Sequence, residues 1–173
     1  MYIILFFISG YLLVVFLGLR LVAPFLGFRQ YRLPSEIPVE IRQAIVELEN
    51  QAKDQESFLQ AVYNFILEKN SVQWRHTRLS AAMRLPRLFV SDLSEIWKTR
   101  DFIYCTGINF VVYVMLANSK FFTGRDIRLK HTFANLVLHQ YLKVKVGQKW
   151  VDVDPAGTGI RGKPLGTHLA GFG

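Results

Sequence analysis

The sequence predicts an α+β fold in which helices come first, a short antiparallel sheet follows, and one transmembrane helix precedes both. Residues 1–19 carry no charged side chain. Apolar residues then recur at helical spacing over residues 39–67. Over residues 138–146 apolar and polar residues alternate with the period of a strand. The length of 173 residues and the hydrophobic fraction of 51% allow one packed domain with a small extension.

Residues 1–28 are expected to form a membrane anchor, because about 20 apolar residues cross a bilayer as a helix and this run contains a single charged residue, Arg20. A buried core helix would usually show a polar stripe, and a signal peptide usually begins with basic residues. Arg29 and Arg32 also follow the run. Since positive flanks stay cytoplasmic, we expect a single-pass membrane protein whose soluble part faces the cytosol, with membrane lipid as a partner.

Two prolines in residues 29–38 predict a linker, and residues 39–173 are expected to form the domain. Its first helices are predicted over residues 39–53 and after an N-cap at Asp54, both packing an apolar stripe against the core. A short helix is expected within residues 91–100. Periodicity is the evidence for each of these elements.

Residues 70–87 form a basic segment without a carboxylate. The ordinary interpretation is a solvated face. Because the chain has a net charge of +8, there are two alternatives to a solvated face: the segment contacts anionic lipid, or it contacts a nucleic-acid backbone. We expect no nucleic-acid partner, because no recognised nucleic-acid motif accompanies the charge.

The only cysteine, Cys105, opens an almost uninterrupted apolar run over residues 106–117. The length of the run favours a helix, whereas its β-branched content favours a strand; we expect a helix. A single cysteine excludes an internal disulfide. By itself it would ordinarily be a small buried core residue.

His139 lies on the predicted strand, with Tyr141 on the same face. Gly147-Gln148 predicts a tight turn and residues 149–153 the partner strand. On that partner Asp152 and Asp154 share one parity, so parity does not decide which of them faces His139. His131 is a second candidate for the base, and residues 156–173 are expected to form an irregular tail.

A cysteine, a histidine and an aspartate in this order can provide a nucleophile, its base and the group that orients the base. The thiolate is the reactive form. A helix N-terminus at Cys105 and a nearby imidazolium at His139 would both stabilise it.

These residues resemble the transglutaminase-like superfamily, part of the papain-like cysteine fold. His139-Gln140-Tyr141-Leu142-Lys143-Val144 is similar to that superfamily's histidine motif, and Trp150-Val151-Asp152-Val153-Asp154-Pro155 is similar to its aspartate motif. The resemblance covers roughly residues 104–157. It implies a triad of Cys105, His139 and Asp154, and so selects Asp154 over Asp152.

The resemblance also implies an oxyanion hole made by the backbone N–H at the cysteine and one upstream donor. Gln73, Trp74 and Trp97 are the candidates for that donor. The implied reaction is acyl transfer from a peptide or amide bond through a thioester, with a protein or peptide as substrate. Water is the expected acceptor, which makes the protein a peptidase or amidase, and an amine is the other possible acceptor.

The alternative is a non-catalytic, membrane-tethered protein- or peptide-binding domain of the same fold. No cofactor is expected: residues 157–162 match G-x-G-x-x-G, but Pro164 blocks the helix that a dinucleotide site needs. No metal is expected either, because the four histidines lack metal-ligand spacing.

Overall fold

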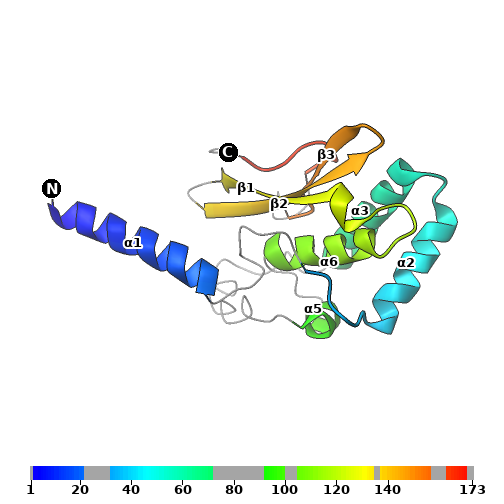
Figure 1. The fold of residues 1–173 in the computed structure, drawn as a ribbon, viewed down its shortest axis with the longest axis horizontal. Coiled ribbons are helices and arrows are strands. Elements are labelled where there is room, and N and C mark those ends of the chain that lie inside the picture. The colour runs from blue at the N-terminus through cyan, green and yellow to red at the C-terminus, as the bar shows by residue number, and fades with distance from the viewer. Residues whose placement is uncertain are drawn as a thin grey trace.

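The computed structural model describes residues 2–21, 32–71, 92–99, 105–134, 137–156 and 163–170. Within these ranges the chain is an α+β protein with five α-helices, one short 3-10 helix and a three-stranded sheet. The elements are α1 (Tyr2–Leu21), α2 (Val39–Gln51), α3 (Gln55–Ser71), α5 (Leu93–Thr99), α6 (Cys105–Ala117), η2 (Gly124–Asp126), β1 (Ile127–Ala134), β2 (Val137–Val146) and β3 (Lys149–Val153). Figure 1 shows α6 between the sheet and the remaining helices of the domain, with α1 extending away from them.

The predicted transmembrane helix at residues 1–28 is wrong, and with it the single-pass membrane location. A helix does form at α1, and its described side chains between Ile4 and Leu13 are exposed. Crossing a bilayer takes about 20 consecutive apolar residues. Among the residues that the structure describes, no helix meets the combined demand of length and apolar character. Arg20 lies inside α1, one residue before its end.

The helices of the domain form as their apolar spacing predicts. In α2 the buried residues are Ile41, Ala44, Ile45 and Leu48, which lie on one stripe of the helix. α3 follows Asp54, whose Oδ1 accepts the Ser57 N–H at 2.8 Å, as expected for an N-terminal cap. α5 lies within the range predicted for it.

α6 is the centre of the core. Every residue from Ile108 to Leu116 is buried, because the sheet packs on one side of the helix and α2, α3 and α5 on the other (Figure 1). A helix buried on all sides needs no polar stripe, which explains why the run showed no periodicity. The prediction of a helix beginning at Cys105 is confirmed.

The sheet is an antiparallel meander in the order β1-β2-β3. Leu142 and Val144 of β2 and Val153 of β3 are fully buried and belong to the same core as α6. Leu142 lies opposite Val153, so β3 ends while β2 continues toward its own N-terminal end. The stretch of β2 that holds His139 is therefore not paired with β3.

Residues 163–170 contain no helix or strand, as expected, yet they are bonded to the end of the sheet. The Gly166 N–H donates to the Asp152 carbonyl at 2.8 Å, and the Lys163 N–H donates to the Asp154 carbonyl at 3.0 Å. The Tyr63 hydroxyl on α3 donates to the Lys163 carbonyl. These bonds fix residues 163–170, which we call the C-terminal segment, beside the end of β3.

Gly147 at the β2–β3 turn has a φ of 58°, in the left-handed region that glycine adopts without strain. Its N–H donates to Gln55 Oε1 at 3.0 Å, which ties the turn to α3. Gly147→Ala is expected to lower the free energy of unfolding by about 1 kcal/mol, and Gly147→Asn by less, because Asn tolerates this region better. Urea denaturation measures both, and equal losses would contradict the conformational explanation.

Candidate active site

Cys105 is the first residue of α6 and is partly exposed. The positive end of the helix dipole therefore lies at this residue. Residues 108–116 of the helix are buried, so Cys105 lies at the edge of the core.

His139 on β2 lies near both other members of the predicted triad. Its Nε2 lies 2.8 Å from Asp154 Oδ2, and Cys105 is close enough to the ring to help raise the pKa of His139. Nδ1 is the ring nitrogen that this hydrogen bond to the carboxylate does not use. Burial alone would lower the pKa of His139, but its interactions with Asp154 and Cys105 outweigh burial and raise the pKa to about 9. The raised pKa favours the protonated ring at neutral pH.

The strand register shows which of the two aspartates, Asp152 or Asp154, is the partner of His139, a choice that parity alone did not make. Asp152 lies opposite Lys143, and its carboxylate pairs with Lys143 Nζ at 3.1 Å and with His168 Nδ1 at 2.7 Å. Asp154 lies two residues further along, fully buried and bonded to His139. Asp154 is therefore the partner of His139, and Asp152 belongs to a second His–Asp pair.

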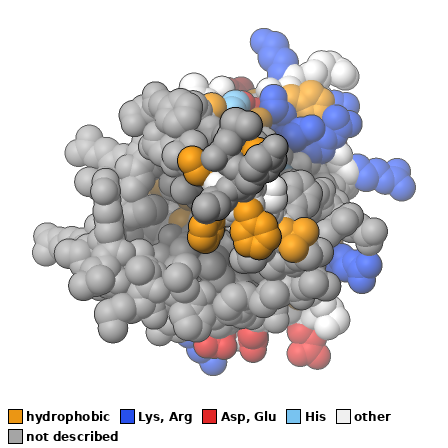
Figure 2. All heavy atoms as spheres, turned by 90° about the vertical axis from the view of Figure 1, so that its left-hand side faces the viewer, with side chains coloured by type: hydrophobic (Ala, Val, Ile, Leu, Met, Phe, Trp, Pro, Cys, Tyr) orange, Lys and Arg blue, Asp and Glu red, His pale blue; other side chains and the backbone are white. Residues whose placement is uncertain are grey.

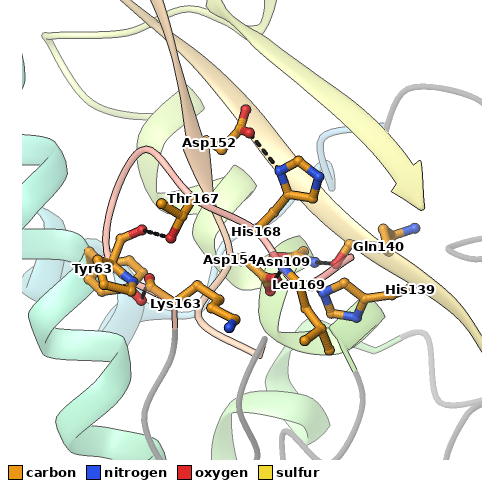
Figure 3. A network of polar contacts seen from close by, with 11 residues as sticks. Tyr63, Asn109, His139, Gln140, Asp152, Asp154, Lys163, Thr167, His168 and Leu169 are labelled. Atoms are coloured by element: carbon orange, nitrogen blue, oxygen red, sulfur yellow. Dashed lines mark hydrogen bonds and ion pairs between the residues drawn. The ribbon is translucent and has the colours of Figure 1, made fainter. Parts of the chain in front are cut away.

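The C-terminal segment completes the surroundings of Asp154 (Figure 3). The Leu169 N–H donates to Asp154 Oδ2 at 2.9 Å, the same oxygen that bonds His139. The preceding residue, His168, is held by Asp152 and stacks flat on Tyr141, with ring centroids 4.0 Å apart and an interplanar angle of 2°. Sequence reasoning missed this contribution, because no period or motif marks residues 163–170.

Asn109 is a further buried residue that sequence reasoning missed. It follows Cys105 by one helical turn, and its Nδ2 donates to the Gln140 carbonyl at 2.6 Å. This bond joins α6, which begins at Cys105, to β2 beside His139 (Figure 3). A polar residue one turn after the cysteine, inside an otherwise apolar run, was the available signal.

The other predicted site residues have different positions. Trp97 is buried and stacks on Phe65, with Lys69 Nζ over its ring, so the described contacts make it part of the core. Gln73 and Trp74 lie outside the described residues, as do most of the basic segment 70–87 and the glycines of residues 157–162.

His131, the second candidate for the base, lies on β1 opposite Gln140, and its Nε2 is 3.2 Å from Gln140 Nε2. Burial lowers the pKa of His131, which favours the neutral ring. The described part of the chain contains no cluster of three or more His, Cys, Asp or Glu side chains suited to a metal ion.

Searches against protein-family models, curated proteins and solved structures found no match to this chain.

The raised pKa of His139 predicts a pH-dependent stability. A group whose pKa is higher in the folded state contributes stability that is fully present below its unfolded value of about 6.5 and is lost as pH rises through about 9. Replacing Asp154 by Asn should remove this dependence. Urea denaturation should find the variant less stable than the wild type by roughly 1–3 kcal/mol at pH 6, with a smaller difference at pH 9.5. A difference that grows with pH would contradict the argument.

Asn109→Ala should cost about 1–3 kcal/mol of folding free energy, because the Gln140 carbonyl beside His139 would be left without this buried donor. Asn118→Ala is the matched control: the Asn118 Nδ2 donates to the Val114 carbonyl at the other end of the same helix, at 2.7 Å, but is only partly buried. Chemical denaturation compares the two. A control that loses as much stability as Asn109→Ala would mean that burial of the bond is unimportant.

Proposed function

We propose that this protein is a cysteine-dependent acyl-transfer enzyme that cleaves peptide or amide bonds, as its resemblance to the transglutaminase-like superfamily implies. One observation carries the proposal: the buried imidazole of His139 hydrogen-bonds a buried carboxylate and lies near enough to the only thiol of the chain for Cys105 to raise the pKa of His139. A cysteine that serves only packing needs no such partner. A thiol, an imidazole and a carboxylate that orients the imidazole are the groups that thiol catalysis requires.

In the proposed reaction the Cys105 thiolate attacks the carbonyl carbon of the substrate. The positive end of α6 stabilises the oxyanion that forms. The C–N bond breaks as the His139 imidazolium gives its proton to the departing amine, which leaves a thioester on Cys105. A water molecule then attacks the thioester while His139 takes up a proton, the C–S bond breaks, and a carboxylic acid is released.

Asp154 contributes by holding the ring rather than by exchanging protons. Its Oδ2 bonds Nε2, so that in this proposal Nδ1 is the nitrogen that serves the thiol. The Leu169 N–H on the same oxygen restricts rotation of the carboxylate. Water is the acceptor in this proposal, since no feature of the described residues recognises an amine in particular.

The test is the rate at which iodoacetamide alkylates Cys105 between pH 6 and pH 7, where few ordinary thiols are ionised. The rate should fall about tenfold or more in His139→Ala, because the imidazolium that stabilises the thiolate is gone. His131→Ala is the matched control and should change the rate less than twofold. Circular dichroism establishes that both variants are folded.

A second measurement follows the thioester itself. An activated ester of a small acid should add one acyl group to the wild type by mass spectrometry, and none to Cys105→Ser under the same conditions. Equal alkylation rates in all variants, together with no acyl adduct, would refute catalysis and favour a non-catalytic peptide-binding domain.

A further inference from the structure

A second His–Asp pair lies close to the predicted triad, and the proposed reaction does not use it. His168 Nδ1 is 2.7 Å from Asp152 Oδ2, and Lys143 Nζ lies 3.1 Å from the other oxygen of the same carboxylate. The ring of His168 also lies flat on Tyr141, with the two centroids 4.0 Å apart. A bond in the plane of the ring and a stack on its face together leave the His168 side chain little freedom to turn.

The peptide bond that follows His168 carries the N–H that reaches the triad. This N–H belongs to Leu169 and lies 2.9 Å from Asp154 Oδ2, the oxygen that is also 2.8 Å from His139 Nε2. Because a peptide unit is planar, the position of His168 restricts where the Leu169 N–H can point. Figure 3 shows His168 bonded to Asp152, with Leu169 beside Asp154 and His139.

The other bonds of the C-terminal segment hold its beginning. The N–H groups of Lys163 and Gly166 donate to carbonyls at the end of the sheet, and the Thr167 hydroxyl donates to the Pro164 carbonyl within the segment. Gly166 has a φ of 89°, which glycine adopts without strain, so the chain turns there. Beyond this turn, the side-chain contacts to the sheet that the described residues show are those of His168.

His168 lies nearer the surface than the carboxylate that its neighbour contacts. Its side chain is 27% exposed, whereas that of Asp154 is fully buried. In Figure 2 a histidine is visible at the upper edge of the molecule, beside Lys and Arg side chains. Because truncating a partly exposed side chain opens no cavity in the core, His168 can be replaced at small cost to the fold.

We infer that His168 is a positioning residue: held by Asp152 and Tyr141, it keeps the Leu169 N–H against Asp154, and this N–H keeps the carboxylate turned toward His139. The inference rests on the proposed function and adds a residue to its site. Rotation of the Asp154 carboxylate would break the bonds to His139 and Leu169 together, so the second bond raises the cost of rotation. An imidazole held in one orientation is what thiol catalysis needs from the third group.

The test compares the full-length chain with its variant His168→Ala, using NMR of ¹⁵N-labelled protein near neutral pH. The Nε2–H of His139 is identified as the resonance that His139→Ala removes. In His168→Ala its exchange with water should be about tenfold faster, because Asp154 no longer holds it steadily. The alkylation rate of Cys105 between pH 6 and pH 7 should fall about threefold in the same variant.

Two further variants serve as controls. His168→Asn keeps an N–H donor near the position of Nδ1 and should return both rates to within about twofold of the wild type. Thr167→Ala is the matched control in the same segment, since it removes a bond to Pro164 only, and it should change neither rate more than about twofold. Equal effects of His168→Ala and Thr167→Ala would overturn the inference.

A merely structural role of His168 would lower the free energy of unfolding in urea and leave both rates unchanged in the folded protein, and this result would also overturn the inference. The Nε2–H exchange involves no thiol chemistry, so the two proposals can fail separately. Faster exchange in His168→Ala, in a protein that forms no acyl adduct, would refute acyl transfer and support the positioning role. An acyl adduct with unchanged exchange would do the reverse.

Discussion

The hydrogen bond between His139 and Asp154 depends on the register between β2 and β3. Leu142 lies opposite Val153, and this pair is fully buried. A slip by one residue would turn every side chain of the strand to the other face, so burial of Leu142, Val144 and Val153 holds the register firmly. The contact between His139 and Asp154 is thus fixed by core packing rather than by the strength of a single bond.

β3 ends opposite Leu142, before it reaches the part of β2 that holds His139. Past Leu142, the backbone of β2 has no partner on β3, and buried polar groups must be satisfied by other means. Asn109 supplies the donor to Gln140, and the Leu169 N–H supplies one to Asp154. The gap left by β3 is therefore where α6 and the C-terminal segment approach His139. A longer β3 would exclude both.

Sequence patterns identified the parts of this site that rest on local rules. The strand alternation placed His139 and the two aspartates on one face, and the apolar run after Cys105 formed a helix. Patterns could not choose between Asp152 and Asp154 without the motif resemblance, because parity is identical and only the register differs. The contacts of Leu169 with Asp154 and of His168 with Tyr141 join residues that are distant in the sequence, and such contacts produce no periodic pattern. The anchor prediction at residues 1–28 relied on an apolar run without a polar stripe or the basic start of a signal peptide, and the described helices do not bear it out.

One strand carries both core residues and a member of the predicted triad. On β2 Leu142 and Val144 fill the core, and His139 and Tyr141 at the other parity are buried as well. Since His139 shares one backbone with Leu142 and Val144, the packing that locks these two residues also fixes the position of the His139 ring relative to Asp154. A change that shifts the register between β2 and β3 would therefore also break the hydrogen bond between His139 and Asp154.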